Sequence, residues 1–171
     1  IVVVYTGTDY GTLTGEPATI TVDKQLTFQS TGGTVGISSI FEVATGALAN
    51  KAIFNSGAFN LKGGLTLTSG TLDNPSGLVT VSGGTVTVAA VSTTTKVTGQ
   101  LSFSGAVNWI YNAAYTTGDE FPNTGGSVNN FTTTAAVTVK SGASVTVNGI
   151  INTGAALNLG GNNWTVNGNT P

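Results

Sequence analysis

Residues 63–88 read GGLTLTSGTLDNPSGLVTVSGGTVTV, and the alternation within this stretch decides the fold. Three segments of it, residues 65–68, 79–82 and 85–88, alternate an aliphatic residue with Thr or Ser. A period of two places the aliphatic side chains on one face of a β-strand and the hydroxyls on the other. Gly, Ser and Asn, which accept turn geometry readily, separate the segments. The stretch therefore predicts short strands, each with one buried face, joined by tight turns.

The same pattern extends over the rest of the chain and predicts an all-β fold. It returns in residues 136–139, 144–147, 157–159 and 164–166. The 171 residues include 31 Thr and 25 Gly, which favour strands and turns respectively. Helical periodicity is nearly absent, and the best candidate, residues 41–54, is interrupted by Gly46. With 39% hydrophobic residues and a mean hydropathy of +0.23, the chain has enough apolar surface to fold.

The spacing of the apolar pairs distinguishes two all-β architectures. Pairs of apolar residues two positions apart recur along the chain, and the sequence distance from one pair to the next is alternately long and short. The pairs lie at positions 65/67, 79/81 and 86/88 and later at 137/139, 145/147 and 157/159. A β-sandwich places antiparallel strands roughly every 8–12 residues. One coil of a parallel β-helix instead takes roughly 20 residues in two or three short strands, which is close to one long and one short interval together. We therefore predict a right-handed parallel β-helix, that is, a solenoid, with a β-sandwich as the alternative.

The scarcity of charge favours the same architecture. Charged residues make up 7% of the chain, against roughly 25% of an ordinary soluble domain. Stacked coils place like residues above like, so that Thr and Asn on the outside bond one another without charges. A sandwich of this size would carry more Lys and Glu on its strand edges. We expect residues 1–171 to form a single solenoid segment of about eight coils, as part of a longer chain.

The composition excludes most catalytic chemistry. The chain has no His, Cys, Met or Arg, and its five Lys and seven acidic residues give a net charge of −2. Without His or Cys there is no Ser-His-Asp or Cys-His nucleophile, no thiolate or imidazole metal ligand and no disulfide. Five Lys are too few to neutralise nucleic-acid phosphates, and no segment approaches the roughly 20 apolar residues of a membrane helix. We therefore predict no enzymatic activity, no cofactor, no nucleic-acid partner and no membrane insertion.

Residues 106–126 break the repeat and are expected to leave the coil as a loop. Aromatic residues gather in this segment, namely Trp109, Tyr111, Tyr115 and Phe121. Exposed rings can stack on sugar faces while nearby amides and hydroxyls bond the sugar hydroxyls, so these four residues are the candidates for binding a surface glycan. The alternative is that Trp109 and Tyr111, which are two positions apart, point to one side and fill the core.

Asp119 and Glu120 form the only adjacent acidic pair and are a weak candidate for binding Ca²⁺, which takes several oxygen ligands. Their neighbours Gly118 and Phe121 add no side-chain ligand. The glycine- and aspartate-containing nonapeptide of calcium-binding solenoids does not occur either. We therefore predict no firm metal site.

The apolar residues 1–5, with the sequence IVVVY, suit a different role under the sandwich alternative. They would insert into the open sheet edge of a neighbouring subunit. The protein would then be a β-sandwich filament subunit completed by donor-strand exchange.

Several stretches in the second half of the chain resemble a known class of repeat. They include residues 107–109, 111–112, 127–132 (SVNNFT), 136–139, 145–149 and 158–162 (NLGGN), together with Gly118, Phe121 and Pro122. They are similar to the adhesin-like β-solenoid repeat regions of very large secreted surface proteins of Bacteroidota, which the type IX secretion system commonly exports. The similarity covers roughly residues 61–166 and is weaker before them.

The resemblance implies an extracellular or cell-surface location and a structural or adhesive role. We therefore expect a non-catalytic stalk segment of a secreted surface protein. Its partners would be surface glycans or neighbouring protein segments. The glycan-binding module and the filament subunit are the alternatives.

Overall fold

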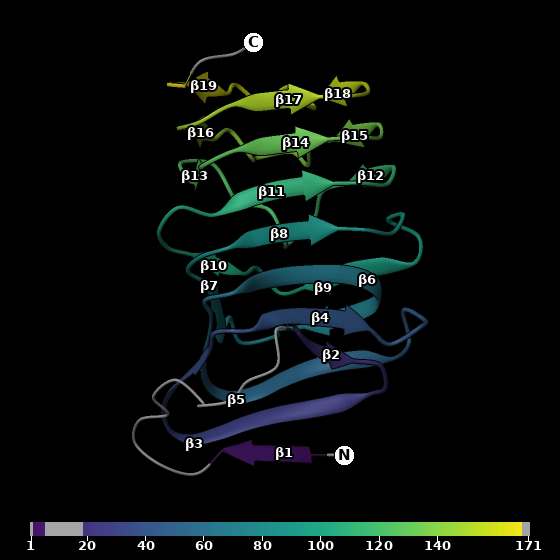
Figure 1. Cartoon of the computed structure of the whole chain (residues 1–171), viewed down its shortest axis with the longest axis vertical. Coiled ribbons are helices and arrows are strands. Elements are labelled where there is room, and N and C mark those ends of the chain that lie inside the picture. The colour runs from purple at the N-terminus through teal and green to yellow at the C-terminus, as the bar shows by residue number, and fades with distance from the viewer. Residues whose placement is uncertain (1, 6–18, 169–171) are drawn as a thin grey trace.

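The computed structural model describes residues 2–5 and 19–168, which form a parallel β-solenoid of about seven coils (Figure 1). Every strand pairing among these residues is parallel. They contain no helix, and so none that is long and apolar enough to cross a membrane. The predicted parallel β-helix is confirmed. A β-sandwich, which needs antiparallel pairs, is not the fold.

The strands stack on the equivalent strands of neighbouring coils and define three faces. Face 1 consists of β2 (Thr19–Val22), β4 (Ile40–Ala44), the first half of β6 (Gly64–Asp73), β8 (Thr85–Val88), β11 (Asn108–Tyr111), β14 (Phe131–Thr133) and β17 (Ile151–Thr153). Face 2 consists of β1 (Val2–Tyr5), the first parts of β3 (Leu26–Ile37) and β5 (Lys51–Leu61), the second half of β6, β9 (Thr95–Thr98), β12 (Tyr115–Thr116), β15 (Val137–Thr138) and β18 (Leu157–Asn158). Face 3 consists of the remaining parts of β3 and β5, β7 (Val79–Val81), β10 (Ser102–Phe103), β13 (Ser127–Val128), β16 (Thr146–Val147) and β19 (Thr165–Val166).

Face 1 shows the repeat most clearly because its register runs through the stack. Val86 pairs with Trp109, and Trp109 pairs with Phe131. The step along the chain from Val86 to Trp109 is longer than the step from Phe131 to its partner Ile151. Since some coils use a longer stretch of chain than others, the protein makes about seven coils and not the eight that we expected.

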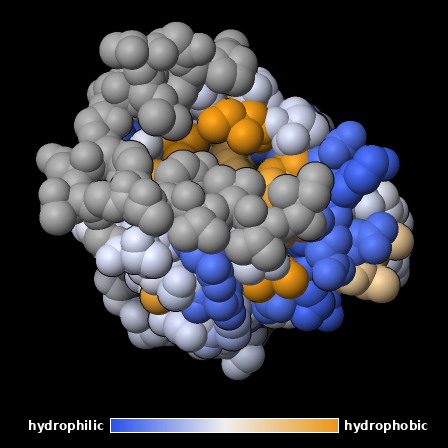
Figure 2. Space-filling model, turned by 90° about the horizontal axis from the view of Figure 1, so that it is seen from below, coloured by the Kyte–Doolittle hydropathy of each residue, from blue (hydrophilic) through white to orange (hydrophobic). Residues whose placement is uncertain are grey.

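Alternate residues of each strand fill the interior. The middle coils contribute fully buried aliphatic side chains: Leu65, Leu67, Leu72, Val79, Val81, Val86 and Val88. In the lower coils, the rings of Phe28 and Phe54 stack with their centroids 4.9 Å apart. Figure 2 looks at the N-terminal end of the stack and shows hydrophobic residues near the centre, with hydrophilic residues to the right of them and below. Burial of each large side chain stabilises the fold by roughly 1.5–3 kcal/mol, so the coils adhere with little help from charge.

Two further expectations are corrected by the strand pairing. Residues 106–126 do not leave the coil as a whole, because β11 lies between β8 and β14 in face 1 and β12 pairs with β15; only residues 117–126 form a longer connection, which leads to β13. The segment that donor-strand exchange would give to a neighbouring subunit is used within this chain, because Val2–Tyr5 pairs with β3. Ile1 lies outside the described residues.

Gly84 occupies a corner where two coils approach closely. Its φ of +67° lies in the left-handed region that favours glycine. A Cβ atom on Gly84 would also overlap the backbone of Gly63 and Gly64 on the coil below. Gly77 has almost the same φ, +65°, but a Cβ there would meet nothing within 4 Å. Gly77 therefore requires glycine for its dihedral angle alone, whereas Gly84 requires it for the angle and for space.

This pair of glycines gives a matched test of coil packing. Gly77→Ala should lower the free energy of unfolding by about 1–2 kcal/mol, because Ala is strained at positive φ. Gly84→Ala should lower it by about 1–3 kcal/mol more, because the added methyl group overpacks the contact between coils. Urea denaturation followed by circular dichroism measures both values. Equal losses for the two variants would contradict a role for close coil approach at Gly84.

Candidate functional site

The strand ladders of faces 2 and 3 are interrupted at one level of the stack. Among the described residues, β9 pairs only with β6 and β12 only with β15, while β10 pairs only with β7 and β13 only with β16. Face 1 stays continuous at this level through the pairing of β8 with β11. We call this interruption the seam. It divides the lower coils from the upper coils on two of the three faces.

The seam coincides with a longer connection between strands. Residues 117–126 join β12 to β13, whereas the shorter segments 139–145 and 159–164 join the equivalent strands of the next two coils. The longer connection carries Phe121 into the core, where its ring meets that of Trp109 edge-on at 5.8 Å. Because the chain bends inward here, the strands on either side do not keep register with the coil below.

Gln100 bridges the seam with its side chain. Its Nε2 donates hydrogen bonds to the backbone oxygens of Asp119 and Phe121, both at 3.1 Å. Its Oε1 accepts a hydrogen bond of 2.8 Å from Nζ of Lys140. Backbone N–H groups add to the bridge, because Gly99 donates to Oδ2 of Asp119 at 2.9 Å. One amide side chain thus replaces part of the missing strand ladder.

Glu120 is a fully buried carboxylate beside the seam. Its side chain accepts hydrogen bonds from the N–H of Gly118 at 2.9 and 3.0 Å, and one of 3.1 Å from the hydroxyl of Tyr111. The backbone oxygen of Glu120 accepts a bond of 3.3 Å from the indole Nε1 of Trp109. The polar groups of this part of the core therefore satisfy one another, as buried polar groups must.

Burial dominates the titration of this cluster. It raises the pKa of Glu120, although hydrogen bonds from Gly118 and Tyr111 and the charge of Lys140 oppose it. Burial also lowers the pKa of Lys140, against the charges of Asp119 and Glu120. It raises the pKa of Tyr111, and the negative charge of Glu120 adds to that shift.

The structure places all four candidate glycan-binding aromatics in the core. The exposed fractions are 0% for Trp109, Tyr111 and Phe121 and 5% for Tyr115. Trp109 and Tyr111 occupy inward positions of β11, in register with Val86 and Val88 of β8. Their rings are therefore unavailable for stacking on a sugar. Trp109 and Tyr111 instead fill the core, as the alternative based on their spacing predicted.

The carboxylates of Asp119 and Glu120 do not converge on a shared cation. Asp119 bonds the N–H of Gly99, whereas Glu120 points into the core toward Tyr111. Among the described residues, no group of three or more His, Cys, Asp or Glu residues could hold a metal ion. Since Ca²⁺ takes roughly six to eight oxygen ligands, this pair does not fit a calcium site.

A groove of about 330 Å³ opens on face 3 at the seam. Its lining consists of Gln100, Leu101, Phe103, Ser104, Gly105, Pro122, Asn123, Thr124, Gly126 and Ser127. No charged residue is among them. The groove lies where β10 and β13 do not pair, so the same irregularity creates both the seam and the groove.

Sequence reasoning missed Gln100 and Phe103. Neither residue belongs to a motif, and Gln100 acts through backbone atoms that lie a whole coil further along the chain. The extra length of residues 117–126 relative to the later coils is the sequence signal that marks this level of the stack.

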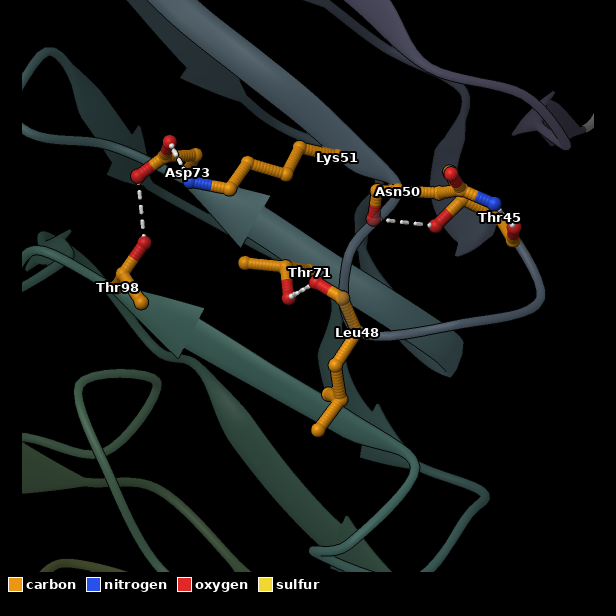
Figure 3. Close-up of polar contacts among 7 residues, drawn as sticks. All are labelled: Thr45, Leu48, Asn50, Lys51, Thr71, Asp73 and Thr98. Atoms are coloured by element: carbon orange, nitrogen blue, oxygen red, sulfur yellow. Dashed lines mark hydrogen bonds and ion pairs between the residues drawn. The ribbon is translucent and has the colours of Figure 1, made fainter.

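A second polar network lies on the outside of face 2, across three consecutive coils (Figure 3). Asp73 accepts hydrogen bonds from Nζ of Lys51 at 2.8 Å and from the hydroxyl of Thr98 at 2.5 Å. In the adjoining corner, the hydroxyl of Thr71 donates to the backbone oxygen of Leu48 at 2.8 Å. Lys51 and Asp73 make the only ion pair among the described residues. These contacts tie neighbouring coils together on their outer surface.

No protein-family model, curated protein or solved structure matches this chain.

The buried carboxyl of Glu120 predicts a specific pH dependence of stability. Because its pKa is higher in the folded state than the 4.5 of an unperturbed Glu, its favourable contribution is fully present below about pH 4.5. That contribution is lost as the pH rises through the folded pKa. Between pH 4 and 7, the free energy of unfolding of Glu120→Gln should therefore fall less with rising pH than that of the wild type, as measured by urea denaturation.

Gln25→Ala is the control for this experiment, because Gln25 is exposed and carries no ionisable group. This variant should keep the wild-type difference in stability between pH 4 and 7. Parallel pH curves for Glu120→Gln and the wild type would refute the assignment to Glu120.

Proposed function

We propose that this chain is a non-catalytic stalk segment of an extracellular surface protein, where it acts as a rigid spacer. The observation that carries the proposal is the continuous face 1 ladder, which links every coil from β2 to β17 in parallel register. Its hydrogen bonds run along the axis of the stack, so bending or stretching the rod strains many of them together. Solenoids of this kind are stabilised by contacts between neighbouring repeats.

The contacts outside the ladder support the same role. The Lys51–Asp73–Thr98 network joins three coils on face 2. On face 1, Glu42 accepts hydrogen bonds from Thr21 on one coil and Thr68 on another. Side chains therefore reinforce the axial direction at the surface as well as in the core.

The chemistry of the chain supports a role without catalysis. The sequence has no His, Cys or Arg. The groove is lined by uncharged residues. The buried carboxylate of Glu120 is engaged by Gly118 and Tyr111. None of these groups is arranged as a nucleophile with an adjacent base.

The location is tested on the cells that produce the protein. Antibodies raised against the purified chain should label intact cells, and external protease should remove that label. Labelling that appears only after the cells are permeabilised would contradict a surface stalk.

The mechanical role predicts that the chain resists load and that the seam yields first. Stretched between its ends in optical tweezers, the wild type should rupture cooperatively. Gln100→Ala should rupture at lower force and lose about 1–3 kcal/mol of unfolding free energy, because it removes the Gln100 donor from the backbone oxygen of Phe121 and leaves that of Asp119 with the N–H of Leu101 alone. Gln25→Ala, at an exposed position, is the control and should match the wild type. Unravelling of the wild type at the lowest measurable loads would contradict the mechanical role.

A further inference from the structure

We propose that the groove at the seam binds a neutral oligosaccharide. This binding site is distinct from the spacer role and does not depend on it. It also differs from the aromatic cluster suggested by the sequence, whose rings are buried. Four properties of the groove lead to this class of ligand: its lack of charge, its free hydroxyl and amide groups, its aromatic wall and its short strand edges.

The lining favours an uncharged ligand. None of the ten lining residues carries a charge. Two charged groups at the seam are already engaged, because Asp119 bonds the N–H of Gly99 and Lys140 bonds Oε1 of Gln100. A carboxylate, phosphate or ammonium group entering the groove would lose its hydration without gaining an opposite charge.

The rim of the groove offers polar groups that are free to bond a ligand. Ser104, Asn123 and Ser127 are exposed, and their side chains make no hydrogen bond within the part of the chain that the structure describes. The hydroxyl of Thr124 accepts a bond of 3.2 Å from the N–H of Ser144 and keeps its own proton to donate. Hydroxyls and amides both donate and accept, which suits the many hydroxyl groups of a sugar.

Phe103 supplies an apolar wall. Its side chain is half-buried, and its ring packs edge-on against the fully buried Trp109 with centroids 5.2 Å apart. This contact holds the ring in place before a ligand arrives, which reduces the entropy lost on binding. Pro122 also lines the groove but is itself buried, so Phe103 is the main apolar contact for a ligand. Sugar rings present C–H groups on one face and hydroxyls at the edge, and the groove matches both.

The strand edges at the groove exclude an added peptide strand as the ligand. β10 and β13 contain two residues each. A peptide that extends a sheet needs a longer edge, because its affinity comes from a row of backbone hydrogen bonds. The volume of about 330 Å³ is at the small end of the range of roughly 300–1,000 Å³ for ligand pockets. It therefore suits a short portion of a longer glycan.

The proposal is tested by titrating the ¹⁵N-labelled chain with three probes and recording amide spectra. The probes are cellotetraose and chitotetraose, which are neutral, and tetragalacturonate, which is charged. At least one neutral probe should shift the signals of residues 103–105 and 123–127 in a saturable way, and tetragalacturonate should not. The proposal is overturned if neither neutral probe shifts these signals at 10 mM, if the shifts lie elsewhere, or if tetragalacturonate binds equally well.

Variants identify the groups that hold the sugar. Phe103→Ala should weaken binding about tenfold, while Phe103→Tyr, which keeps the ring, should retain it. Because Phe103 also contacts Trp109, the exposed double variant Asn123→Ala/Ser127→Ala provides a second test with little risk to folding, and it should weaken binding at least fivefold. Val91→Ala, an exposed apolar residue outside the groove, is the control. Binding that survives in both Phe103→Ala and the double variant would overturn the site.

Discussion

Parallel hydrogen bonding between the face 1 strands of successive coils is the constraint on which the rest of the structure depends. It holds from β2 to β17, including the level where the other two faces are interrupted. Because register determines which residues point inward, the ladder also sets the order of the core. Phenylalanines such as Phe28 fill the lower coils, aliphatic residues such as Leu65 the middle coils, and Trp109 and Tyr111 the level of the seam. The side chains of each coil pack against those of the coil below, so the stack needs few ion pairs at its surface to hold the coils together.

The seam shows how a solenoid accommodates a longer coil. The added length of residues 117–126 accompanies the loss of regular strand pairing between neighbouring coils on faces 2 and 3. Side chains supplement the backbone there: the N–H of Leu101 still bonds the backbone oxygen of Asp119, Gln100 adds side-chain bonds to the coil above, and Glu120 completes the polar contacts of the interior. A buried carboxylate is tolerated only when donors surround it, and Gly118 and Tyr111 provide them. The same departure from regularity opens the groove, so the binding site that we propose lies where the regular strand pairing is interrupted.

The strands and the coil length could be predicted from the sequence because both depend on local steric rules. Leu65 and Leu67 alternate with Thr, and the pattern returns after about one coil. The same alternation places Trp109 and Tyr111 in the core. The hypothesis that they bind a glycan was based only on the ability of aromatic rings to stack on sugars, and it did not take this alternation into account. The burial of Glu120 was not predictable, because its partners meet it only after the longer connection bends inward. The groove likewise joins residues from two coils that no local pattern relates.

The equal step between partners in the upper coils has a consequence for how such a gene can change. Phe131 stands below Ile151 on face 1, and Val137 stands below Leu157 on face 2 after the same length of chain. Duplication or loss of a DNA segment encoding one such step would leave every remaining rung aligned. Recombination between repeats can therefore lengthen or shorten the rod in whole units without disturbing its architecture. The coil that contains residues 117–126 is the exception, because a copy of it would bring a second discontinuity with it.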